Sequence, residues 1–232
     1  MALCCVIVYT YSMYFWKNGE SIDLPSGKVV CVGRNYVEHV HELHSDMPTE
    51  PLLFIKPQTS IQQLGTNLQL SSHLGPIHYE CELALLVGKT MKCVNPADSL
   101  SGIMAIGLAL DLTLRELQYT LQENGHPWER CKAFDGSCPI TPFIPLSDVS
   151  SLQDTHFKLF INDDCKQEGQ PNLMIFGIAD LLATMSQFFT LNPGDIVLTG
   201  TPKGVGPLKN NDKLVLQLGQ DLTVTSTVSI AP

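Results

Sequence analysis

The stretch that decides the fold is His78-Tyr79-Glu80-Cys81-Glu82-Leu83-Ala84-Leu85-Leu86-Val87-Gly88. Apolar side chains occupy every second position from Tyr79 to Val87, whereas Glu80 and Glu82 fall on the opposite face of the expected strand. Two carboxylates on a partly buried face repel each other unless a cation lies between them or one of them is protonated. A solvated strand face is the ordinary alternative for an isolated Glu-x-Glu pair. Paired carboxylates are also the ligands that a hard divalent metal prefers.

A third carboxylate shifts the balance toward a metal site. Asp111 ends the apolar run 103–110, which predicts a buried strand, and a lone carboxylate is costly to bury there. Its alternative partner is Arg115, four residues on. Three carboxylates without a neighbouring cysteine–histidine cluster indicate Mg²⁺ or Mn²⁺ rather than zinc.

The bulk composition limits the range of functions. The chain has 232 residues, of which 44% are hydrophobic and 16% charged, so it is globular and long enough for one domain with a sizeable core. The net charge of −9 and the lack of a basic run argue against a nucleic-acid surface. None of the eight cysteines forms a Cys-x-x-Cys pair, which indicates reduced thiols in a cytoplasmic protein.

The N-terminal region differs from the rest of the chain. Residues 2–16 are apolar and almost uncharged, yet they are too few for a membrane span, which takes roughly 20 residues. They predict an extra strand or an extension, with a secretory leader as the alternative. Residues 17–28 are polar and turn-rich and predict a linker or hairpin. We therefore expect an extension and linker over 1–27 and the catalytic domain over 28–232.

Several elements can be placed from the pattern of apolar residues. Strands are predicted over 29–33, 51–56, 103–110 and 195–198, and helices over 37–43, 114–123 and 175–189, whereas 58–77 is expected to be loop-rich. Thr113 and Glu116 have the spacing of a capping box for the second helix. Many short strands with few helices predict a β-dominated α+β fold.

Two further positions have residue types suited to acid–base chemistry. His39 and Glu42 are three residues apart and share a helix face, where a carboxylate orients an imidazole and raises its basicity. An ordinary exposed helix pair explains the spacing equally simply. A histidine metal site that also used His41 and His44 is a poor alternative, because His39 and His41 lie on different faces.

Lys132 and the glycine-rich segment 199–206 are candidate anion-binding groups. Lys132 lies in a proline-flanked loop and could hold a substrate carboxylate or a developing enolate, although a surface lysine is the simpler interpretation. Segment 199–206 follows a predicted strand and lacks the Gly-Lys-Ser/Thr ending of a P-loop. It is either a tight turn or a set of backbone N–H groups directed at an anion.

Taken together, these motifs resemble the fumarylacetoacetate hydrolase family in order and spacing, from about residue 28 to the C-terminus. The resemblance is closest to its short, single-domain acylpyruvase and oxaloacetate decarboxylase branch. The segments that carry it are Gly33-Arg34-Asn35-Tyr36, His39, Glu42, Phe54-Ile55-Lys56-Pro57, Glu80-x-Glu82, Asp111, Lys132-x-Phe134 and Thr199-Gly200-Thr201-Pro202-x-Gly204-Val205-Gly206.

The resemblance implies a β-roll of mixed sheets, assembled as a homodimer in the cytoplasm, with Mg²⁺ or Mn²⁺ as the cofactor. It implies one role for each candidate residue: metal ligands Glu80, Glu82 and Asp111; catalytic residues His39, Glu42 and Lys132; substrate contacts Arg34, Arg115, Gln118 and Thr201.

The implied chemistry acts on small 2-keto acids. Such an acid chelates Mg²⁺ through its C1 carboxylate and C2 carbonyl, so that the metal can stabilise an enolate. Acylpyruvate hydrolysis, oxaloacetate decarboxylation and keto–enol tautomerisation share this enolate, and the sequence does not rank them. Two more classes of protein stay open: an isomerase or decarboxylase of aromatic catabolism, and a non-catalytic β-rich binding protein. No nucleic-acid or membrane partner is expected.

Overall fold

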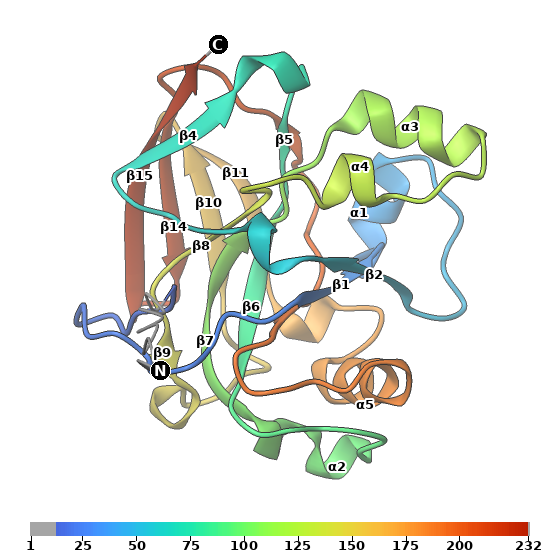
Figure 1. Cartoon of the computed structure of the whole chain (residues 1–232), viewed down its shortest axis with the longest axis vertical. Coiled ribbons are helices and arrows are strands. Elements are labelled where there is room, and N and C mark those ends of the chain that lie inside the picture. Colours follow the sequence, from blue (N-terminus) through green and yellow to red (C-terminus); the bar gives the residue numbers. More distant parts are fainter. Residues whose placement is uncertain (1–12, 232) are drawn as a thin grey trace, which may run out of the picture.

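A mixed eight-stranded sheet forms the centre of the computed structural model, which describes residues 13–231 (Figure 1). Of the extra strand or leader predicted for 2–16, residues 2–12 lie outside the described residues. The strand order is β2 (Leu52–Lys56), β1 (Val29–Gly33), β12 (Ile196–Leu198), β6 (Cys81–Val87), β7 (Ile103–Leu110), β8 (Cys138–Ile140) and β3 (Ile61–Gln63), with β9 (Ile144–Pro145) paired to β7.

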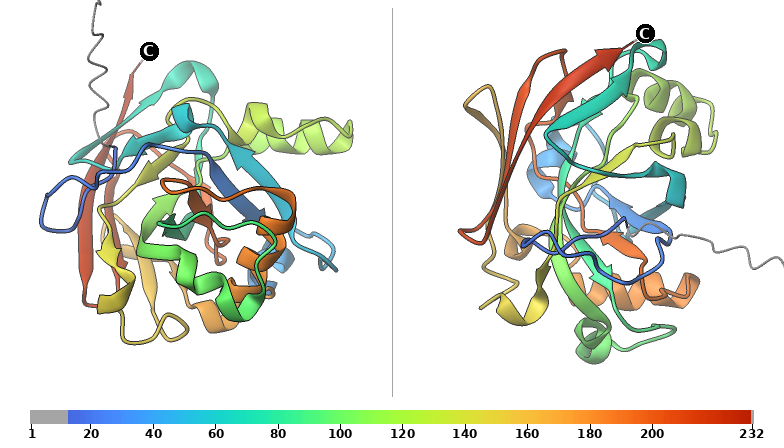
Figure 2. Two further views of the ribbon diagram at one scale, coloured as in Figure 1. Left: turned by 60° about the horizontal axis from the view of Figure 1, so that its bottom comes forward. Right: turned by 60° about the vertical axis from the view of Figure 1, so that its left-hand side comes forward.

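A five-stranded sheet covers one face of the central sheet, and a two-stranded ribbon completes the strands (Figures 1 and 2). The larger of the two has the order β11 (Asp164–Gly169), β10 (Phe157–Ile161), β14 (Lys213–Leu218), β15 (Leu222–Ala231) and β4 (Asn67–Ser71), and the ribbon joins β13 (Gly206–Pro207) to β5 (His78–Tyr79). Leu83 and Leu85 of β6 share one core with Phe157 and Leu216 of the second sheet. The predicted strand-rich α+β fold with mixed sheets is confirmed.

Short helices surround the sheets. Figure 1 shows α1, α3 and α4 together on one side of the central sheet and α2 and α5 at its lower end. The α-helices are α1 (Val37–Glu42), α2 (Pro96–Ser99), α3 (Arg115–Glu123), α4 (Glu129–Lys132) and α5 (Ile178–Phe188), and the 3₁₀ turns are Gln58–Ser60, Ser72–Leu74, Leu100–Gly102, Leu146–Asp148 and Pro171–Leu173. Across residues 13–231, no helix has the length and apolar character to cross a bilayer.

A second core lies on the other face of β6. Ala84 and Leu86 pack there with the side chain of Tyr14, which is fully buried and donates a hydrogen bond of 2.7 Å to the Gly194 carbonyl. β6 is therefore buried on both faces, which explains why its apolar residues run together after Glu82. The described part of the N-terminal region covers the central sheet, and the division at residue 27 stays a prediction.

Two local predictions are wrong. Segment 58–77 was expected to be loop-rich, but it contains β3 and β4. These short strands pair in parallel with distant segments, β3 with β8 and β4 with β15, and such pairing leaves no local pattern in the sequence. The capping box at Thr113 does not form, because α3 begins after Leu114 without a side-chain cap. The Thr113 hydroxyl instead donates to the Asp111 carbonyl at 3.1 Å and accepts a hydrogen bond from Lys132.

The strand directions bring four chain segments to one edge of the central sheet. β1 and β12 are parallel, so both end at this edge. β6 is antiparallel to β12 and begins there, and β7 is antiparallel to β6 and ends there, with Cys81 opposite Leu110. The residues that follow β1, β7 and β12 therefore meet those that begin β6.

Candidate active site

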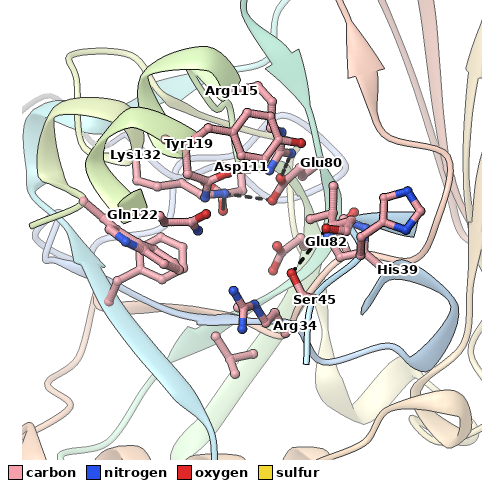
Figure 3. Close-up of a pocket in the computed structure, with 18 of the residues that line it drawn as sticks. Arg34, His39, Ser45, Glu80, Glu82, Asp111, Arg115, Tyr119, Gln122 and Lys132 are labelled. Atoms are coloured by element: carbon pink, nitrogen blue, oxygen red, sulfur yellow. Dashed lines mark hydrogen bonds and ion pairs between the residues drawn. The ribbon is translucent and has the colours of Figure 1, made fainter. Parts of the chain in front are cut away.

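A cluster of three buried carboxylates occupies this edge. Glu80 lies at the break between β5 and β6, Glu82 lies within β6, and Asp111 directly follows β7. Each contributes a carboxylate oxygen, and these oxygens lie within 4.8 Å of one another (Figure 3). Among the residues that the structure describes, this is the one group of three or more acidic, histidine or cysteine side chains close enough to hold a metal ion.

Two cations neutralise Glu80. Lys132 Nζ lies 2.8 Å from Glu80 Oε2 and 2.6 Å from Asp111 Oδ2, and the guanidinium of Arg115 pairs with Glu80 Oε1. Burial raises the pKa of Glu80, but the charges of Lys132 and Arg115 outweigh it and hold that pKa well below its ordinary value. Glu80 is therefore a carboxylate at neutral pH.

Glu82 lacks an ion-pair partner among the described residues. Its Oε2 accepts a hydrogen bond of 2.5 Å from the Gly200 N–H, in the glycine-rich loop after β12. Burial, followed by the charges of Asp111 and Glu80, raises its pKa well above the ordinary value. The site thus takes up positive charge at Glu82, as a proton or as a cation.

A divalent metal fits this donor set. Its three side chains offer oxygen atoms only, which is the preference of Mg²⁺ and Mn²⁺. Asp111 Oδ1 also lies 2.7 Å from Lys56 Nζ without an aligned hydrogen bond from any described residue. That oxygen retains lone-pair capacity, which a metal ion can use.

Lys56 belongs to the site, although the sequence analysis assigned it no function. Its side chain is completely buried at the end of β2, and its Nζ contacts Asp111 and donates to the backbone carbonyls of Lys132 and Ser137. A buried ammonium needs such partners. Lys56 therefore ties Asp111 to the end of α4, from which the Lys132 side chain extends. The available signal was a lysine closing the apolar strand Leu52–Lys56.

His39 and Glu42 form a pair beside the cluster. His39 Nδ1 lies 3.0 Å from Glu42 Oε2, and Glu42 Oε1 accepts a hydrogen bond of 2.9 Å from the Gly204 N–H. Burial raises the pKa of Glu42, but the hydrogen bonds from His39 and Gly204 together outweigh it and lower that pKa below 4.5. The glycine-rich loop thus directs its N–H groups at two carboxylates of the protein itself, Glu82 and Glu42.

Gln167 is the second residue that sequence reasoning missed. It projects from β11 of the second sheet, where its Oε1 accepts from the Cys81 N–H at 2.8 Å and its Nε2 donates to Thr201 Oγ1 at 2.8 Å. Thr201 Oγ1 in turn donates to the Cys81 carbonyl at 2.9 Å. The peptide between Glu80 and Glu82 is therefore held from both sides. The sequence itself offers no more than an uncharged Gln167 between the charged Lys166 and Glu168.

The cluster opens into a cavity of about 320 Å³. All ten residues predicted for the site except Glu42 line it, and Glu42 touches it through His39. Arg115 Nη1 donates to Gln118 Oε1 at 2.5 Å on one wall, and Figure 3 shows Arg34 on the side opposite Arg115. Tyr119, Gln122 and Trp128 add polar and aromatic surface. The catalytic, metal-binding and substrate-binding roles of the ten predicted residues stay predictions. The geometry shows that nine of them line one cavity.

The fold and this cavity define an enzyme built around a buried carboxylate cluster. The chain belongs to the fumarylacetoacetate (FAA) hydrolase family, whose C-terminal domain model matches residues 28–229. It is 45% identical over 215 residues to the oxaloacetate tautomerase YcgM of Escherichia coli K12, covering 92% of this chain and 98% of that protein. It is also 36% identical over 196 residues to the mitochondrial oxaloacetate decarboxylase of Dictyostelium discoideum, covering 84% and 87%.

A solved structure extends the comparison. The fumarylpyruvate hydrolase of Pseudomonas aeruginosa, crystallised with Mn²⁺ and pyruvate, superimposes with a TM-score of 0.88 at 30% identity over 95% of this chain and 96% of that chain. The predicted membership of the family and the prediction of an enzyme are confirmed.

Proposed function

We propose that this enzyme interconverts the keto and enol forms of oxaloacetate or a closely similar 2-keto acid, with a divalent metal at the carboxylate cluster. The observation that carries the proposal is that one cavity is lined by both the Glu80–Glu82–Asp111 cluster and His39, which is paired with Glu42 behind it. The E. coli relative, which matches almost over its full length, is named an oxaloacetate tautomerase.

The metal would be held by Glu80, Glu82 and Asp111. When bound, a divalent ion supplies a Lewis acid that polarises the carbonyl group of a chelating 2-keto acid. The Mn²⁺ found in the Pseudomonas aeruginosa relative supports a divalent ion here. The choice between Mg²⁺ and Mn²⁺ stays a prediction.

The proton transfer is assigned to His39. Glu42 is ionised and engages Nδ1, so the hydrogen bond favours the tautomer that carries its proton on Nδ1 and leaves Nε2 free to accept one. In the keto-to-enol direction His39 Nε2 takes a proton from C3, the electron pair of the broken C–H bond forms the C2–C3 double bond, and the C2 oxygen takes a proton from solvent water. The imidazolium then returns its proton to solvent. Lys132, fixed between Glu80 and Asp111, supplies positive charge close to the oxygen on which negative charge develops.

Arg115 and Gln118 are proposed to bind the C1 carboxylate. Arg115 keeps its guanidinium at the cavity wall through Glu80 and Gln118, and its Nε has no hydrogen-bond partner among the described residues. The Thr201 hydroxyl is already engaged with Cys81 and Gln167, so its contact with substrate would use its remaining lone pair.

Decarboxylation of oxaloacetate is the second candidate, since the Dictyostelium relative is named for it. Loss of CO₂ needs an electron sink but no base. Acylpyruvate hydrolysis needs a base that activates water, and the Pseudomonas relative is named for a reaction of that kind. A non-catalytic binding protein and an enzyme of aromatic catabolism are not favoured by these relatives.

One substrate panel tests the proposal. Enol oxaloacetate is followed by its ultraviolet absorbance, pyruvate release reports decarboxylation, and acetylpyruvate reports hydrolysis, each with Mg²⁺, Mn²⁺ or excess EDTA. We expect metal-dependent tautomerisation to be the fastest reaction. Rates equal to those in buffer with every metal would reject the proposed function, and pyruvate release faster than tautomerisation would reverse the order of the two candidates.

The predicted homodimer and cytoplasmic location stay predictions. Light scattering of the purified chain tests the first, and fractionation of cells that express it tests the second.

A further inference from the structure

Arg34 differs from the other strong cations that line the cavity. Lys132 and Arg115 are paired with Glu80 or Asp111. Arg34 lines the same cavity, yet its side chain forms no ion pair with any residue in the described part of the chain. Figure 3 shows its guanidinium directed into the cavity from the wall opposite Arg115. A cation placed in this way is available to an anion from outside.

The backbone holds Arg34 in an unusual conformation. Its φ is 58°, in the left-handed region that a non-glycine residue adopts only under strain. The next residue, Asn35, is fixed by hydrogen bonds of 2.8 Å from its Nδ2 to the Thr199 carbonyl and from the Phe176 N–H to its Oδ1. These contacts fix the chain beside Arg34, so the direction of its Cα–Cβ bond is set by the fold.

The charges around the cavity also favour an anionic ligand. The three carboxylates of the cluster are balanced in number by Lys56, Lys132 and Arg115, although the ion pairs of these cations reach only Glu80 and Asp111. A divalent metal would therefore leave a surplus of positive charge, and Arg34 adds to it, against the carboxylates of Asp46 in the lining and of Glu42 behind His39. A monocarboxylic 2-keto acid compensates part of this positive charge, and a dicarboxylic 2-keto acid compensates more of it.

We infer that Arg34 binds the second carboxylate of a dicarboxylic 2-keto acid, and so selects oxaloacetate over keto acids that end in a neutral group. The inference rests on the proposed function and adds its specificity determinant. A guanidinium can bind a carboxylate through two parallel hydrogen bonds, which makes it suited to this recognition. A cavity of about 320 Å³ suits a small ligand that spans Arg115 and Arg34.

A matched pair of ligands tests the inference. Oxaloacetate and 2-oxobutanoate differ only by a terminal carboxylate in place of a methyl group. Their binding is measured in the presence of Mg²⁺ through the fluorescence of Trp128, which lines the cavity. A hydrogen-bonded charge pair contributes roughly 1.5–3 kcal/mol, so Arg34→Gln should weaken oxaloacetate binding about 10- to 100-fold. Binding of 2-oxobutanoate should change about twofold at most, and Arg34→Lys should recover part of the loss.

Three results would overturn the inference: equal weakening of both ligands, no weakening of oxaloacetate, or a wild-type protein that binds both equally well. Failure of the proposed function would look different, because the wild-type protein would then fail to turn over oxaloacetate at all. Arg34→Gly takes the place of the glutamine variant if that variant does not fold, because glycine adopts the left-handed conformation without strain.

Discussion

The carboxylate cluster and His39, with its partner Glu42, meet at one cavity but are supported very differently. Glu82 belongs to β6, which is hydrogen-bonded to a strand on each side and buried on both faces. Glu42 lies at the end of α1, a six-residue helix without a side-chain cap, and its side chain is 31% exposed. The cluster is part of the core, whereas the pair depends on one short helix and on the Gly204 N–H.

This difference in support separates the proposed metal binding from the proposed proton transfer. Elements with many buried contacts open only with most of the protein, whereas short, exposed elements open locally at lower cost. The fold thus keeps the proposed metal ligands fixed and leaves the proposed proton-transfer group easier to displace. Substitutions in the two regions should therefore have separable effects on metal affinity and on turnover.

The largest effect is expected from Glu82→Gln. This change removes a ligand oxygen charge, and because a metal ion contributes several kcal/mol of transition-state stabilisation, turnover should fall by about 1,000-fold or more. Metal affinity, measured by titration calorimetry, should fall with it.

The metal-free Glu82→Gln variant should be no less stable than the wild type, because it no longer buries a carboxyl of raised pKa. The exposed Glu168→Gln is the control, and unchanged metal binding in Glu82→Gln would remove this residue from the ligand set.

His39→Ala should have the next largest effect, and only on turnover. A positioned base contributes about 100- to 10,000-fold, so tautomerisation and acylpyruvate hydrolysis should slow by that range. Decarboxylation should slow less, because it needs no base. Metal affinity should remain at the wild-type value. A matching loss of metal affinity would show that the two regions are not separable, and equal slowing of decarboxylation would reject the acid–base role.

Gln167→Leu should affect the cluster more mildly. The glutamine holds the Cys81 peptide between two proposed ligands, and loss of such outer contacts typically lowers metal affinity 10- to 100-fold. Leucine is close in volume, so the fold should be retained. The measurement is metal affinity together with turnover at saturating metal. Recovery of turnover at high metal concentration is expected; its absence would mean that Gln167 acts beyond positioning the ligands.

The sequence predicted those parts of the site that follow from the pattern of neighbouring residues in the chain. The strands around Glu82 and Asp111 follow from apolar runs, and the order of the motifs identified the family. Gln167 and Lys56 could not be assigned roles in this way, because their partners are 86 and 55 residues away in the chain and only the packing of the sheets brings them together. The β3 and β4 strands were missed for the same reason, since their pairing is parallel and between distant segments.

The smallest effect is expected at Glu42, and it depends on pH. The folded-state pKa of Glu42 is lowered, so its ionised form stabilises the protein at pH values above the ordinary pKa of 4.5, and this contribution disappears as the pH falls through the lowered value. Glu42→Gln should therefore be slightly less stable than the wild type at pH 7, and the gap should close as the acid limit is approached. Glu38→Gln is the matched control, because it removes a carboxylate from the exposed face of the same helix, where Glu38 pairs with Lys203. Urea unfolding between pH 3 and pH 7 provides the measurement.

A difference in unfolding free energy that stays constant with pH would mean that the hydrogen bonds from His39 and Gly204 do not favour the charged Glu42 carboxylate. The orientation of His39 by Glu42 would then lose its physical basis.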